Sequence, residues 1–138
     1  MSSKDFKISM RIFHPTRRGE DIVKHVPLEF KIMQSVGDDR RTPKGNELEG
    51  AYDRTYISFD LPEENGETLE DVLRRVLKEK VMTNPKFFED LFETGGSTEF
   101  FIGIFCRKSL GIEIGMDIID ALALTKIVLS IDFYGEHF

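Results

Sequence analysis

Apolar and polar side chains alternate along several short segments of this chain, and this period of two predicts half-buried β-strands. The segments are residues 6–13, 28–34, 56–61 and 127–135. In the second segment the pattern predicts that Leu28, Phe30 and Ile32 point into the core. Residues 99–108 are apolar on both faces and predict a central strand that is covered on both sides or at least shielded on its outer one. A short apolar run at residues 110–115 predicts one more strand.

Other segments carry their apolar residues at the spacing of an α-helix. They are residues 20–26, residues 68–82, a segment that begins at Asn84 and stops at the glycines at 95 and 96, and residues 116–126. In the second of these, Thr68 and Asp71 have the spacing of an N-terminal capping box. In the third, the spacing predicts that Phe88, Leu91 and Phe92 are buried.

The order of these elements, β-α-β-β-α-α-β-β-α-β, predicts one α+β domain over residues 1–138. We expect a mixed, mostly antiparallel sheet with the helices mainly on one face. Residues 21–28 (DIVKHVPL) and 117–124 (DIIDALAL) match in spacing, and each lies between two predicted strands. One explanation is a duplicated split βαβ unit, as in ferredoxin-like folds. The other is that any short amphipathic helix leading into a strand produces such a match.

Composition and charge argue against several kinds of binding partner and site. The chain has 138 residues and a net charge of −6, with a pI near 5.1. This balance argues against nucleic-acid binding, which needs a basic face or stripe. A single cysteine excludes an intramolecular disulfide and a cysteine-rich zinc site. The chain opens without an apolar leader and contains no run of eighteen apolar residues, so we expect a soluble cytoplasmic protein with no membrane partner.

Several short motifs together resemble a bacterial family called domain of unknown function 4279. They are IFHP at 12–15, the glycine loop at 45–54 that leads into a strand, the glycine pair at 95–96, and LSIDFYG at 129–135. The resemblance spans nearly the whole chain and implies a compact α+β domain. Where that family has an aromatic residue after the glycine loop, often Trp, this chain has Tyr56. The family has no established activity, so the resemblance implies no catalytic residue.

Residues with catalytic or metal-binding chemistry are sparse. His14, His25 and His137 are too scattered to form a local metal motif. His14 and Cys106 are the sharpest catalytic candidates, because in duplicated halves the strands ending at residues 13 and 106 would lie side by side and parallel. The competing interpretation is that Cys106 is a small buried hydrophobic residue. We therefore assign no catalytic residue, no metal site and no cofactor.

Residues 40–55 (RRTPKGNELEGAYDRT) are the least core-like segment of the chain. Gly45 and Gly50 have the separation found in a P-loop, but the Lys and Ser/Thr of that motif are missing and a strand follows. The segment is therefore interpreted as a hairpin loop rich in salt bridges. A competing hypothesis is that its arginines join others in a small cationic site for an anionic ligand. The residues of that candidate site are His14, Arg17, Arg18, Arg41 and Arg54.

Three functional hypotheses follow from the sequence. The first is a non-enzymatic protein-interaction or regulatory domain, such as an immunity-type protein that neutralises a toxin, because the chain is small and acidic and carries no catalytic motif. Its expected partner is another protein, bound through loops or an exposed sheet face. The second is a sensor domain that binds a small molecule or anion. The third is a small enzyme that uses Cys106 and His14.

Overall fold

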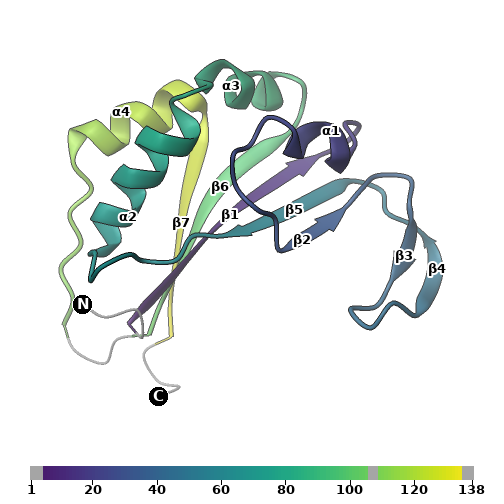
Figure 1. Cartoon of the computed structure of the whole chain (residues 1–138), viewed down its shortest axis with the longest axis horizontal. Coiled ribbons are helices and arrows are strands. Elements are labelled where there is room, and N and C mark those ends of the chain that lie inside the picture. The colour runs from purple at the N-terminus through teal and green to yellow at the C-terminus, as the bar shows by residue number, and fades with distance from the viewer. Residues whose placement is uncertain (1–4, 106–108, 135–138) are drawn as a thin grey trace.

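A five-stranded sheet with helices packed on one face forms the body of the protein (Figure 1). The computed structural model describes residues 5–105 and 109–134. The strands are β1 (Phe6–His14), β2 (Ile32–Gln34), β3 (Asp39–Arg41), β4 (Glu47–Ala51), β5 (Thr55–Asp60), β6 (Ser97–Ile104) and β7 (Ile127–Phe133). The helices are α1 (Gly19–Val23), α2 (Leu69–Val76), the π-helix η1 (Leu77–Val81), α3 (Pro85–Glu93) and α4 (Met116–Thr125).

The sheet has the order β2-β5-β1-β6-β7. β1 is its central strand and pairs antiparallel with both β5 and β6. Among the paired strands that the structure describes, only β6 and β7 are parallel, and α4 connects them. The α+β class and the mostly antiparallel mixed sheet are thus confirmed.

The two βαβ segments of the sheet differ from each other. β5 lies between β1 and β2, so the β1-α1-β2 segment is split. In contrast, β6 and β7 are direct neighbours, so the β6-α4-β7 segment is not. The structure therefore does not repeat one split unit, and the match between residues 21–28 and 117–124 reflects two short helices that lead into strands.

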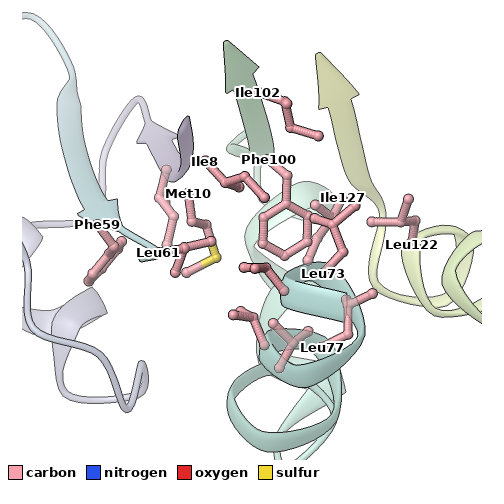
Figure 2. Close-up of a cluster of buried hydrophobic side chains, with 14 of the residues drawn as sticks. Ile8, Met10, Phe59, Leu61, Leu73, Leu77, Phe100, Ile102, Leu122 and Ile127 are labelled. Carbon is pink, nitrogen blue, oxygen red and sulfur yellow. The ribbon is translucent and has the colours of Figure 1, made fainter. Parts of the chain in front are cut away.

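The hydrophobic core lies between the sheet and the helices (Figure 2). Pairing places Met10 of β1 beside Phe59 of β5 and Phe100 of β6, and all three side chains are completely buried. α2 covers them with one apolar stripe, as its spacing predicts. Thr68 and Asp71 form the predicted capping box, in which each side chain accepts a hydrogen bond from the other residue's backbone N–H.

The segment predicted as a strand over residues 28–34 is corrected by the structure. Only Ile32–Gln34 form the strand β2, at the edge of the sheet. Met33 pairs with the buried Ile57 and packs on the core. The expectation that Leu28, Phe30 and Ile32 point inwards is wrong for the last two, which are 43 % and 40 % exposed, while Leu28 is half-buried against the core.

Two further predictions about buried residues are corrected. In α3 the buried aromatic residues are Phe87 and Phe88, whereas Phe92 is 51 % exposed. The buried face of α3 is therefore rotated from the one expected. Residues 110–115 form no regular element, although their apolar side chains pack against the core as partly buried residues.

Most of the segment 40–55 belongs to a separate hairpin. β3 and β4 pair antiparallel as a separate two-stranded sheet beyond β2 (Figure 1). Gly45 and Gly50 have φ near +87° and +82°, a conformation that glycine adopts without strain. The glycines of this segment thus shape a hairpin, in agreement with the hairpin interpretation.

Candidate functional site

His14 is a buried structural residue at the end of β1. Only 1 % of the residue's surface is exposed. Its Nδ1 accepts hydrogen bonds from the backbone N–H groups of Thr16 and Arg17, at 3.1 and 2.9 Å. Its Nε2 lies 2.8 Å from Oγ1 of Thr94, which itself donates to the carbonyl of Asp90. These bonds need an unprotonated Nδ1, and burial together with the charge of Arg17 lowers the pKa of His14.

The arginines that follow His14 are already engaged within the protein. Arg17 places its guanidinium 5.2 Å from the ring centre of Phe87 in α3. Arg18 forms ion pairs with Glu20 at 3.0 Å and with Asp38 at 2.8 Å, and these carboxylates raise its pKa. The positive charge of Arg18 is therefore balanced locally.

Arg41 lies on the β3–β4 hairpin, where it is also paired. Its guanidinium contacts Glu47 at 3.5 Å and donates to the carbonyl of Gly45 at 3.2 Å. A hollow of about 550 Å³ separates the hairpin from β2, and Asp38 and Asp39 line it together with Arg41. Carboxylates beside the arginine make this hollow a poor site for an anion.

Arg54 lies on the face of the sheet that carries no helix. Its guanidinium carbon is 4.5 Å from the ring centre of Phe13, and the Phe13 ring lies 5.0 Å from that of Tyr56. On the same face, Arg11 lies over Phe101, with 3.8 Å from its guanidinium carbon to the ring centre. We name the surface formed by Arg11, Phe13, Arg54, Tyr56 and Phe101 the aromatic–arginine face.

The five residues of the predicted cationic site are therefore not brought together. His14 is buried, Arg17 packs on α3, and Arg18 and Arg41 pair with different carboxylates. Arg54 alone belongs to the aromatic–arginine face.

Strand register places the aromatic–arginine face opposite the core. β1 residues alternate between the two faces, so the buried Met10 and Ile12 leave Arg11 and Phe13 on the other side. α2, α3 and α4 all lie on the core side (Figure 1), and α1 contributes Ile22 to the same core. In the described part of the chain, no helix covers the aromatic–arginine face.

A shallow hollow of about 240 Å³ lies in this face beside the stacked residues. Arg11, Tyr56 and Phe101 line it, and Lys7 and Lys31 stand among its other residues. Arg11 also lies 3.6 Å from a carboxylate oxygen of Glu99 on β6. The Nε atom of Arg11 is buried without a hydrogen-bond partner among the described residues.

The alternation in β1 and β6 was the signal that could have located this face. It places Arg11 and Phe13 away from the core, and Phe101 away from the buried Phe100 and Ile102. The sequence does not show that β1 and β6 are neighbours, which is what sets Arg11 beside Phe101.

The candidate catalytic pair rested on parallel strands, and the structure overturns this premise. β1 and β6 are antiparallel, with Phe13 opposite Ser97 and Phe6 opposite Ile104. His14 therefore lies at the start of β6, while the described end of β6 lies at the opposite end of the sheet. Cys106 itself lies outside the described residues.

Other charged side chains on the helices pair with acids nearby. Arg75 of α2 contacts Glu67 at 3.0 Å, and this guanidinium holds the pKa of Glu67 below its ordinary value. Arg74 contacts Asp117 at 2.8 Å and lowers the pKa of that carboxyl group in the same way. These charges of α2 thus pair with nearby acids on a solvated helix surface.

The fold and the aromatic–arginine face define an α+β domain in which the described helices cover one face of the sheet and leave the other open. Comparisons of the chain with family models, curated proteins and solved structures found no match. The resemblance to the bacterial family therefore stays a prediction. Within residues 5–105 and 109–134, no helix has the length and apolar character needed to cross a bilayer. The same residues contain no cluster of three or more potential metal ligands.

Proposed function

We propose that this chain is a non-enzymatic protein-interaction domain of the bacterial cytoplasm that binds another protein through the aromatic–arginine face. The observation that carries the proposal is the stacking of Arg11 on Phe101 and of Arg54 on Phe13, on a sheet face that no described helix covers. Arginine and aromatic residues are the types that contribute most binding energy in protein interfaces.

Stacking also prepares these arginines for binding. A guanidinium that lies over a phenylalanine ring can still donate its exposed N–H groups to carboxylates or backbone carbonyls. The ring restricts the side chain before the partner arrives, so less conformational entropy is lost on binding. The partner that fits is a protein surface with carboxylates beside apolar groups. Such a partner would be the target of a regulatory domain, or a toxin that an immunity-type protein neutralises.

The anion-sensor alternative has less support. Its cationic site is not assembled, because Arg18 and Arg41 pair with separate carboxylates.

The test is affinity copurification from the native bacterial host, with charge-reversal variants. We expect a stoichiometric partner to copurify with the wild-type protein, and to be lost with Arg54→Glu and with Phe101→Ala. Arg40→Glu is the matched control, because it makes the same charge change on the exposed β3 strand of the hairpin. Chemical cross-links to the partner should start from Lys7 and Lys31, which line the hollow in this face.

Two results would refute the proposal. One is a partner that is retained by Arg54→Glu and Phe101→Ala while both variants remain folded. The other is the absence of any stoichiometric partner of the wild-type protein in the host.

A further inference from the structure

β7 is an unprotected edge of the sheet. It is the outermost strand of the order β2-β5-β1-β6-β7, and within the described residues it pairs only with β6. Natural edge strands are usually short, bulged, or protected by lysine or proline. β7 has seven residues, IVLSIDF, with neither lysine nor proline and with Asp132 as its one charge. The opposite edge strand, β2, has only three residues.

The backbone groups that β7 offers can be assigned to particular residues. Tyr134, just after β7, donates its N–H to the carbonyl of Ile104 in β6. Because successive residues of a strand point their N–H and C=O groups to opposite sides, the even-numbered residues bond to β6. The odd-numbered residues point these groups away from the sheet. They are Ile127, Leu129, Ile131 and Phe133, and on that side no hydrogen bond joins their backbone to another described residue.

Side chains at this edge are apolar and incompletely covered. Phe133 is 67 % exposed and Val128 is 54 % exposed, although Ile127 is buried. α4 packs on β7 at this side of the molecule (Figure 2). It exposes Met116 and Leu124 by 68 % and 53 %. A strand pair alone buries less area than a stable dimer needs. The exposed side chains of α4 would add to the buried area of such an interface.

We propose that β7 pairs antiparallel with β7 of a second copy of this chain, about a two-fold axis at Ser130. In this register Ile127 lies opposite Phe133 of the second copy, and Leu129 opposite Ile131. These are the residues whose backbone groups point outwards, so each pair can exchange two hydrogen bonds. On the other face Val128 lies opposite Asp132, and no two like charges meet.

This self-complementarity is the reason to choose a second copy as the occupant. An isologous contact requires that residue i meets j while j meets i. The axis at Ser130 uses all seven residues of β7 and matches the apolar core-side residues with each other. An axis at Leu129 would leave Phe133 opposite Thr125 of α4, which is no longer strand. The inference is independent of the proposed function, because it uses a different surface.

Opposite charges introduced at one exposed position test the register. Val128→Lys places lysine opposite Asp132 of the second copy, and Val128→Asp places two carboxylates together. Each contact occurs twice in the dimer, so we expect the dimer Kd of the two variants to differ by about tenfold or more, with the lysine variant tighter. Sedimentation equilibrium measures both values. The same two substitutions at Ile32, which is 40 % exposed on the opposite edge, should leave the Kd unchanged.

A cross-link provides the second measurement. Ser130 would face its own copy in a pair without hydrogen bonds, where Cα atoms lie about 4.5 Å apart, within the range of a disulfide. Ser130→Cys combined with Cys106→Ser should form a covalent dimer on oxidation with diamide, whereas Ser9→Cys combined with Cys106→Ser should not. A wild-type protein that stays monomeric at its highest soluble concentration would overturn the proposal. So would an equal Kd for Val128→Lys and Val128→Asp, or the absence of the Ser130 cross-link.

Discussion

Replacing His14 tests whether its neutral side chain holds the junction of β1, α3 and β6 together. His14→Ala removes the acceptor of two backbone N–H groups at residues 16 and 17, and each unsatisfied group costs about 1–3 kcal/mol when buried. Some of this cost is recovered where water reaches the groups. We expect the free energy of unfolding to fall by about 2–4 kcal/mol. His14→Asn keeps an acceptor oxygen near the position of Nδ1 and loses only the bond to Thr94, so we expect a loss of about 1 kcal/mol.

The pH dependence of stability distinguishes a role of the neutral His14 imidazole from a role in packing alone. The folded protein lowers the pKa of His14, so folding favours the neutral imidazole. The contribution of neutral His14 to the free energy of unfolding is fully present above the unfolded pKa of about 6.5. It is lost as the pH falls below that value, by at most about 1.4 kcal/mol per pH unit. Below the folded pKa, His14 is protonated in both the folded and the unfolded protein, so no further stability is lost.

Urea unfolding of the wild type and of His14→Asn at pH 7.5 and pH 5.5 measures the effect. Other groups titrate equally in both proteins, so the difference between them isolates His14. We expect the advantage of the wild type to shrink at pH 5.5. A constant difference, or one that grows at acid pH, would show that the reasoning about the neutral imidazole is wrong.

Two smaller predictions concern a helix cap and a glycine. Thr68→Ala removes the oxygen that accepts from the backbone N–H of Asp71, and should lower the free energy of unfolding by about 1 kcal/mol, while Thr68→Ser should not. Gly96→Ala places a Cβ 2.7 Å from the carbonyl oxygen of Phe13 and 2.8 Å from that of Leu91, and should cost about 1–3 kcal/mol. Gly111→Ala is its control, because no described atom beyond the two neighbouring residues lies within 4 Å of the added Cβ. Urea denaturation measures all four variants, and a Gly96→Ala protein as stable as the Gly111→Ala protein would contradict the packing argument.

Hydrophobic period predicted the elements that have neighbours on both sides. β1 lies between β5 and β6 under a layer of helices, so its alternation maps directly onto burial. α2 also follows its pattern, because one stripe faces the sheet and the other faces water. Segments at the border of the fold were predicted less well. At the edge strand β2, pairing with β5 turned Met33 and not Ile32 towards the core.

Contacts between distant segments explain what the sequence could not show about the site. Phe87 of α3 is buried because His25 stacks on its ring at 4.7 Å and Arg17 lies over it. Neither neighbour is visible in the local spacing. The sequence could not show for the same reason that Arg18 pairs with Asp38, because the two meet only after the chain has turned back past β2. Charge counts describe a segment, whereas a binding site depends on where folding places those charges and their partners.

The proposed strand pairing and the proposed binding surface have a joint consequence. In an antiparallel β7 pair, equivalent faces of the two sheets lie on the same side. The dimer would therefore carry both aromatic–arginine faces on one side of a ten-stranded sheet. A dimeric partner could then engage both faces, and the second contact would form at a high effective concentration. Val128→Asp would weaken binding of a dimeric partner without touching Arg11, Arg54 or Phe101. Binding of a monomeric partner would not change, so one variant distinguishes whether the two surfaces act together.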